Sequence, residues 1–162
     1  KHLDYKNVDA QKTGFKNKQF DFVISSNMIH HLPYPLKFFN EMHRILKRGG
    51  KLIIFDAHCS ATLQIILILM RHEGFDFTKN VWSLKTPATS KEDLWSGNSA
   101  IPFLIFDNEK KFNEHLGHKF TIKIRASQSV RVVNIKNDIC SSSSGSRIEV
   151  HFKQVPIDCV CG

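Results

Sequence analysis

The apolar and polar positions of the chain follow a strand–helix–strand order between residues 20 and 58. Residues 20–24 are rich in β-forming side chains and lead into a polar turn, which predicts a strand. In residues 35–48 the apolar positions recur at helical spacing, which predicts a helix. Gly49-Gly50 is expected to end that helix, because glycine adopts the left-handed cap conformation without penalty. The apolar residues 52–55 then predict a second strand, covered on both faces.

A helix between two buried strands indicates a crossover connection, so the two strands are expected to be parallel and the crossover right-handed. Further along, residues 61–72 are so apolar that a buried helix is expected, although the run is too short to span a bilayer. Phe112 begins a short predicted helix. Residues 119–125 and 129–136 alternate polar and apolar positions and are expected to form an antiparallel pair of strands.

Composition narrows the class of protein only slightly. The 162 residues suffice for one domain with one core, and the formal net charge is +8. The lysines are scattered along the chain, whereas nucleic-acid-binding domains usually cluster their charge, so a nucleic-acid partner is disfavoured. The four cysteines form no pair of C-x-x-C motifs, which argues against a zinc site. This cysteine usage fits a reducing compartment, and the expected location is cytoplasmic.

The segment around residues 20–58 resembles the second half of class I S-adenosylmethionine-dependent methyltransferases. The family pattern there has a strand that begins with FD, a loop with HHL, a helix ending in R-x-L-x-x-GG and a strand that ends in acidic or polar residues. The matching residues are Asp21, His30, His31, Leu32, Arg44, Leu46, Gly49, Gly50 and Asp56. The resemblance implies an α/β fold with a partial Rossmann-like methyltransferase sheet, mostly parallel with an antiparallel C-terminal pair, flanked by helices.

The resemblance also implies where the cofactor, S-adenosyl-L-methionine, would lie. Asp9 and Ala10 match the pair that meets the adenine, although Asp9 is also suited to capping a turn. The backbone near Ser26, Asn27 and Met28 would face the methionine part of the cofactor, because open α/β sheets bind ligands beyond the C-terminal ends of their strands. One of the two histidines, His30 and His31, would pack structurally, and the other would lie near the reaction centre. The sequence slightly favours His31 as the packing residue.

A second resemblance covers the insertion expected at residues 59–108. The pattern HEG…W-x-x-N-x-A-I-P-x-L-x-F characterises a subgroup of these enzymes, and insertions at this place generally build the substrate pocket. The implied substrate-binding residues are His72, Glu73, Trp95 and Asn98. Taken singly, each of these residues also suits a core position or a helix cap.

The family's glycine-rich cofactor loop has no counterpart, because no G-x-G-x-x-G occurs in the sequence. We therefore expect the chain to be the C-terminal part of a longer protein, to be inactive alone, and to leave the strand at residues 22–26 with a bare edge. Residues 1–138 are assigned to the methyltransferase domain. Residues 139–162 are assigned to a serine-rich linker and a tail without a predicted role.

The expected reaction is displacement of the activated methyl group by a small-molecule nucleophile. An oxygen nucleophile would need a base, for which His31, His58, His72 and Glu73 are candidates. Two alternatives remain open: a methyltransferase-like binding or assembly module that has lost catalysis, and an RNA-modifying domain.

Overall fold

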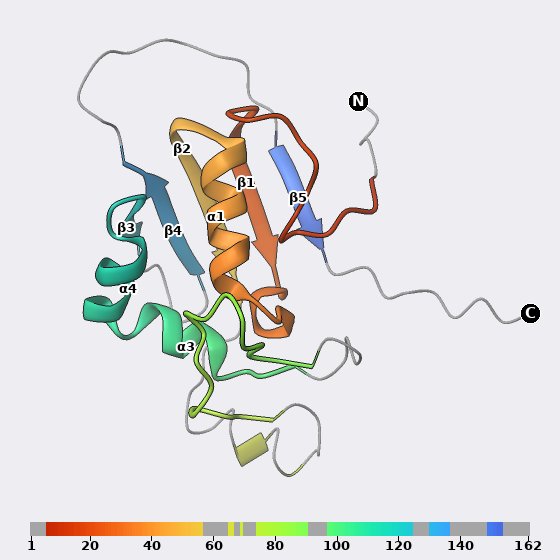
Figure 1. The fold of residues 1–162 in the computed structure, drawn as a ribbon, viewed down its shortest axis with the longest axis vertical. Helices are drawn as coiled ribbons and strands as arrows, with labels where there is room; N and C mark the ends of the chain where they lie inside the picture. Colours follow the sequence, from red (N-terminus) through yellow and green to blue (C-terminus); the bar gives the residue numbers. More distant parts are fainter. Residues whose placement is uncertain are drawn as a thin grey trace, which may run out of the picture.

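Five strands form one mixed sheet in the computed structural model, which describes residues 6–56, 65, 66, 69, 74–90, 97–124, 130–136 and 149–153. The order of the strands across the sheet is β3-β4-β2-β1-β5, as Figure 1 shows. Their bounds are β1 Phe20–Ser26, β2 Leu46–Phe55, β3 Phe120–Ile124, β4 Val130–Ile135 and β5 Glu149–Lys153. The α/β fold class predicted from the sequence is confirmed.

The centre of the sheet is the predicted parallel pair. β1 and β2 run in the same direction, with Val23 opposite Leu52 and Ile24 opposite Ile53. Helix α1, Pro35–Ile45, joins them and lies across one face of the sheet (Figure 1). Its apolar stripe is fully buried against the strands, through Phe38, Phe39, Met42 and Ile45. The strand–helix–strand prediction is therefore confirmed.

The end of α1 differs from the prediction. The helix ends at Ile45, three residues earlier than expected, and Leu46 is already extended. Gly49 and Gly50 lie inside β2, at a shift in its register with β1. Gly49 adopts φ 71°, and a Cβ on Gly50 would lie 2.9 Å from the carbonyl oxygen of Lys47. Both glycines are thus required by an irregular strand start and not by a helix cap.

The antiparallel pair is confirmed. β3 pairs with β4, and β4 pairs antiparallel with β2, which places Val133 opposite Leu52. Helix α4, Glu109–Leu116, precedes β3 and begins where the Asn108 side chain accepts a hydrogen bond from the Lys111 N–H. The short helix α3, Ile101–Phe106, had no counterpart in the prediction; it buries Ile101 and Ile105.

The edge of β1 is not bare, which corrects the prediction. Glu149–Lys153, within the segment assigned to linker and tail, forms β5 and pairs parallel with β1 along Phe22–Ser26. Figure 1 shows β5 beside β1, on the side away from β2. The backbone groups at that edge are therefore satisfied by a segment more than a hundred residues away in the chain.

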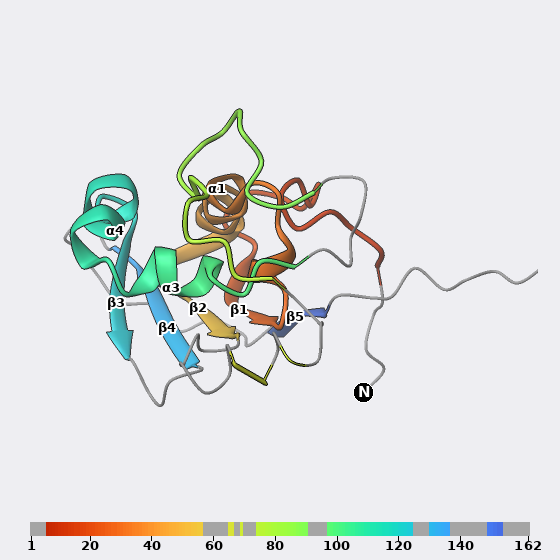
Figure 2. The same cartoon turned by 90° about the horizontal axis from the view of Figure 1, so that it is seen from below.

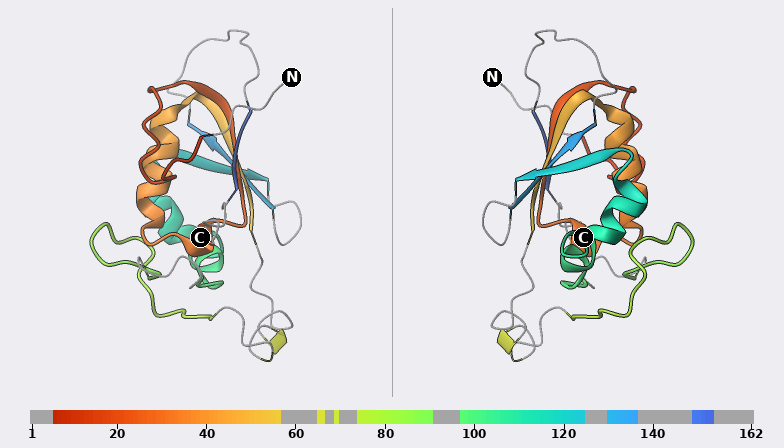
Figure 3. Two further views of the ribbon diagram at one scale, coloured as in Figure 1. Left: turned by 90° about the vertical axis from the view of Figure 1, so that its right-hand side faces the viewer. Right: turned by 90° about the vertical axis from the view of Figure 1, so that its left-hand side faces the viewer.

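The layers are clearest when the sheet is seen from its ends. Viewed from below, the strands form one row, with α1, α3 and α4 on one side of it (Figure 2). The edge-on views of Figure 3 show α1 and α4 on that same side. Three residues of the predicted helix at 61–72 are described: Ile65, Ile66 and Leu69 are helical but 60%, 45% and 78% exposed, so the expected burial is wrong for them. The described part of the chain contains no helix with the length and apolar character needed to cross a bilayer.

Candidate functional site

Polar groups gather where the parallel strands β1 and β2 end. β1 ends at Ser26, and Asn27 turns the chain with φ 47°, a left-handed conformation that asparagine tolerates better than most residues. The Asn27 N–H donates to the Phe55 carbonyl oxygen at 2.7 Å, which ties the ends of the two strands together. A single 3₁₀ turn, η1 at Ile29–His31, follows. Asp56 comes directly after β2.

A buried carboxylate–imidazole pair occupies this edge. His30 Nδ1 lies 2.5 Å from Asp56 Oδ1, and the exposed fractions of the two residues are 6% and 5%. The other carboxylate oxygen, Oδ2, accepts from the Ile29 N–H at 2.9 Å. Because an ionised carboxylate can only accept, this geometry places a proton on His30 Nδ1.

His31 lies against this pair. Its ring centroid is 4.0 Å from that of His30, with the planes tilted by 44°. His31 is half-buried, whereas His30 is buried. His30 is thus the more buried and more tightly held of the two histidines, whereas the sequence slightly favoured His31 for the packing role.

The described residues of the segment predicted to be an insertion are bound to the backbone of η1 and the loop after it. The Asn98 N–H donates to the His30 carbonyl oxygen at 2.8 Å, and the Thr89 hydroxyl donates to that of His31 at 2.9 Å. The Ala88 N–H donates to the carbonyl oxygen of Pro33 at 2.7 Å. These bonds hold Ala88, Thr89 and Asn98 beside the two histidines.

The side chain of Asn98 serves the insertion itself. Its Oδ1 accepts from the N–H groups of Asp76 and Ala100, and its Nδ2 donates to the Asp76 carbonyl oxygen. Asn98 is 6% exposed and forms a bridge with Gly74. With both ends of the amide engaged by backbone, Asn98 is a structural centre of the insertion at the border of the site.

Asp9 and Ala10, the pair predicted to meet the adenine, lie in a turn near the same edge of the sheet. Asp9 Oδ1 accepts from the Gln11 N–H at 2.8 Å, which is the turn-capping arrangement that the sequence left open. Residues 6–8 form no strand, and Ala10 packs into the core. The Gln11 side chain accepts from the Tyr34 N–H at 3.0 Å, so the Asp9 turn lies beside the loop between η1 and α1.

Not every predicted site residue can be placed. His58, His72, Glu73 and Trp95 lie outside the described residues. Ser26, Asn27, Met28 and His31 are adjacent to the strand ends, and Met28 is buried. Asp56 matched the family pattern but was not among the predicted site residues. A carboxylate directly after a buried parallel strand was the sequence signal that could have identified it.

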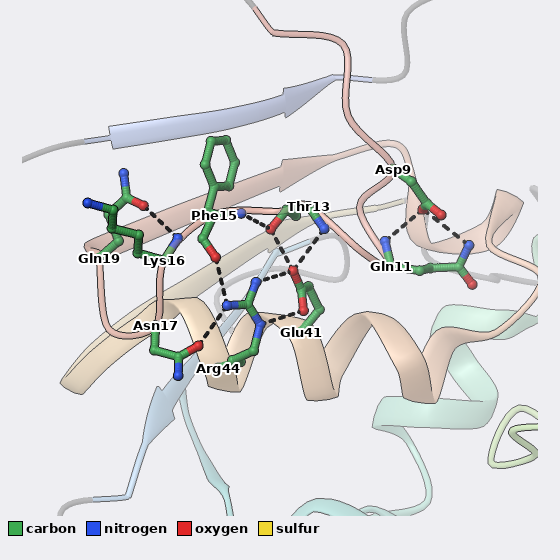
Figure 4. Close-up of polar contacts among 9 residues, drawn as sticks. All are labelled: Asp9, Gln11, Thr13, Phe15, Lys16, Asn17, Gln19, Glu41 and Arg44. Atoms are coloured by element: carbon green, nitrogen blue, oxygen red, sulfur yellow. Dashed lines mark hydrogen bonds and ion pairs between the residues drawn. The ribbon is translucent and has the colours of Figure 1, made fainter.

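A second polar cluster lies at the other end of the parallel pair (Figure 4). Glu41 Oε1 accepts from the Thr13 N–H at 2.8 Å, from the Thr13 hydroxyl at 2.6 Å and from Arg44 Nη2 at 2.6 Å, while Arg44 Nε donates to Oε2 at 2.9 Å. Arg44 Nη1 also donates to the Phe15 carbonyl oxygen and to Asn17. The Arg44 hydrogen bond is the largest cause that lowers the pKa of Glu41, from 4.5 to about 2, and Glu41 in turn raises the pKa of Arg44. Arg44, a family-pattern residue, therefore fastens the loop before β1 to α1.

Comparisons with known proteins agree with the resemblance. Residues 1–54, a third of the chain, match a family model described as a methyltransferase domain. Phosphoethanolamine N-methyltransferase 2 of Caenorhabditis elegans is 38% identical over 52 residues, which are 32% of this chain and 12% of that protein. The chain thus spans about an eighth of the length of this relative.

Solved methyltransferase structures are also similar to the chain at low identity. The crystal structure of the CurJ carbon methyltransferase has a TM-score of 0.46 at 14% identity, over 80% of this chain and 34% of that one. A putative methyltransferase from Bacillus halodurans has a TM-score of 0.42 at 15% identity, over 83% of this chain and 78% of that one. The family match confirms the methyltransferase resemblance drawn from the motifs.

Proposed function

We propose that the C-terminal edge of β1 and β2 is a site of S-adenosyl-L-methionine-dependent methyl transfer to a small-molecule acceptor. One observation supports this most. The residues that match the methyltransferase domain, 1–54, include β1, α1 and most of β2, and polar groups meet where the parallel strands β1 and β2 end. In open α/β sheets this edge is where ligands bind.

The described residues fit such a cofactor. The Asp9 carboxylate and the backbone at Ala10 would hold the adenine side, while Ser26, Asn27, Met28 and His31 would hold the methionine side. A carboxylate, an amide and a turned backbone supply both donors and acceptors, as an adenosine and an amino acid group require. Asn27, whose backbone is in the left-handed conformation, is exposed and turns the chain at the end of β1. The cofactor itself supplies the activated methyl group, and the chain supplies orientation and proton transfer.

His31 is our first candidate for the proton acceptor, since it is half-buried and its ring packs against that of His30, which contacts Asp56 at the end of β2. His58, His72 and Glu73 remain candidates for the same role. His72, Glu73, Trp95 and Asn98 are proposed to border the acceptor, with Asn98 acting through the backbone segments that it holds. Since the sequence has no glycine-rich cofactor loop, we further propose that the 162-residue chain alone binds the cofactor weakly and turns over slowly.

Calorimetric titration with S-adenosylmethionine tests the proposal, on the 162-residue chain and on the same chain within its natural open reading frame. We expect saturable binding in the longer protein and weaker binding in the chain alone. Asp9→Ala is expected to weaken binding roughly tenfold, as loss of a hydrogen bond to a charged group does. Asp107→Ala, in an exposed turn, is the matched control.

Methyl transfer is then measured with phosphoethanolamine as the first acceptor probe, because the similar relative carries that name. A broader panel of small amines, alcohols and acids follows. Saturable cofactor binding with transfer to one acceptor class supports the proposal. Absence of binding in both forms overturns it and favours a binding or assembly module without catalysis.

A further inference from the structure

His30 has more fixed neighbours than the proposed reaction requires. Its Nδ1 contacts Asp56, its ring contacts that of His31, and its carbonyl oxygen accepts from the Asn98 N–H. These three contacts connect His30 to Asp56 at the end of β2, to His31 as the candidate proton acceptor, and to Asn98 in the predicted insertion. His30 is therefore the point where three parts of the site meet.

The orientation of the His30 ring is determined by Asp56. The carboxylate is held from two sides, by the Ile29 N–H on Oδ2 at 2.9 Å and by His30 Nδ1 on Oδ1 at 2.5 Å. With both residues almost fully buried, neither can rotate without losing a hydrogen bond that water would not replace. Such a partner selects the imidazole tautomer with the proton on Nδ1.

His31 is constrained by the fixed ring and by the insertion. Its ring lies 4.0 Å from that of His30 between centroids, and its carbonyl oxygen accepts from Thr89 at 2.9 Å. The side chain of His31 is thus held by the preceding residue, and its backbone is held by Thr89, much later in the chain. Proton transfer depends on such placement, since a shift of about 1 Å is enough to slow a reaction roughly a hundredfold.

We propose that His30 is a positioning residue: Asp56 locks its ring with the proton on Nδ1, and the locked ring holds His31 at the strand ends as the proton acceptor. The geometric part concerns the chain alone. The catalytic part rests on the proposed methyl transfer, so the two parts are tested by separate measurements.

The geometric part is tested by nuclear magnetic resonance on the 162-residue chain with isotope-labelled histidine, at neutral pH. We expect His30 to be protonated on Nδ1 with an exchange-protected proton, and its ring to show nuclear Overhauser contacts to that of His31. In Asp56→Asn the protected proton and the ring contacts should be lost. Asp21→Asn, which removes a carboxylate paired with Lys47 near the opposite end of β1, should change neither.

The catalytic part is tested by kinetics on the longer protein with the acceptor found above. Asp56→Asn should lower kcat roughly tenfold or more while the S-adenosylmethionine dissociation constant changes less than about threefold. His30→Asn keeps a donor that can reach Asp56 but removes the ring beside His31, so it should lower kcat similarly. A merely structural role predicts instead that His30→Asn rescues kcat and that cofactor binding falls together with stability.

The outcomes separate the two proposals. If wild type shows the Nδ1 proton and the ring contacts but binds no S-adenosylmethionine, the proposed function fails and the geometric inference stands. If His30 carries its proton on Nε2, or if the ring contacts survive in Asp56→Asn, the positioning role is overturned even where methyl transfer is observed.

Discussion

The two ends of the β1–β2 pair each bury a carboxylate, but the carboxylates have different neighbours. At the end where β1 begins, Glu41 accepts from Thr13 in the loop before β1 and from Arg44 in α1. At the end where β1 finishes, Asp56 accepts from a backbone N–H and an ionisable imidazole. The first arrangement satisfies its carboxylate with permanent donors and fixes the fold. The second holds a group that can exchange a proton, which is what a reaction requires.

This comparison predicts that damage to the first end lowers stability, whereas damage to the second end mainly changes the site. The lowered pKa of Glu41 gives the scale at the first end. A change from 4.5 to about 2 corresponds to about 3 kcal/mol of native-state stabilisation of the carboxylate, and the side chain is only 10% exposed.

The largest expected effect comes from Glu41→Gln. The amide keeps one acceptor oxygen but loses the other and the charge that pairs with the Arg44 guanidinium, so the free energy of unfolding should fall by up to about 3 kcal/mol, measured by urea denaturation. Glu114→Gln on the exposed side of α4 should change it by less than about 0.5 kcal/mol. Equal effects of the two substitutions would contradict the role given to Glu41.

The same pair predicts a pH dependence. Because the pKa of Glu41 is lower in the native state, its contribution is complete above about pH 4.5 and is lost as the pH falls toward about 2. The stability difference between wild type and Glu41→Gln should therefore shrink over that interval. A difference that stays constant down to pH 2 would show that Glu41 does not carry the contribution.

An intermediate effect is expected from Gly50→Ala. The new Cβ would lie 2.9 Å from the Lys47 carbonyl oxygen and 3.2 Å from that of Asp21, and both are backbone atoms. Forcing this contact should destabilise the chain by about 1–3 kcal/mol in the same denaturation experiment. Gly74→Ala, where nothing lies within 4 Å of the added Cβ, is the control and should be nearly neutral.

A more local effect is expected at the second end from Asn98→Ala. Loss of the amide leaves the Asp76 and Ala100 N–H groups without that acceptor, so residues 74–76 and 97–100 should open more easily, by about 1–2 kcal/mol. Hydrogen exchange at these amides measures the change. Protection in β1 and β2 should be unaffected, and Asn113→Ala on the exposed side of α4 should alter neither region.

The smallest effect is expected from Lys47→Ala. Its ammonium lies 2.8 Å from Asp21 in an ion pair that is partly open to solvent, with side-chain exposures of 36% and 24%. Such pairs contribute about 0–1 kcal/mol, and the contribution decreases with salt. A loss as large as that of Glu41→Gln would mean that the Asp21–Lys47 and Glu41–Arg44 ion pairs had been ranked wrongly.

The sequence by itself determined the strand–helix–strand unit, the parallel direction of β1 and β2, the antiparallel β3–β4 pair and the methyltransferase resemblance. Each depends on periodicity, on glycine and proline positions or on residues close together in the chain, and such signals are local. Even Gly49 and Gly50 were marked as special positions, although the register of β2 decided how they are used.

Only the tertiary structure decided which distant groups meet. His30 and Asp56 are 26 residues apart, Thr13 and Glu41 are 28 apart, and β5 reaches β1 from the far end of the chain. The pattern around β5 contains no information about its partner, because any strand with free backbone groups can pair with an open edge. The choice between His30 and His31 likewise depended on which imidazole reached the carboxylate, and that follows from the packing of η1 between two strand ends.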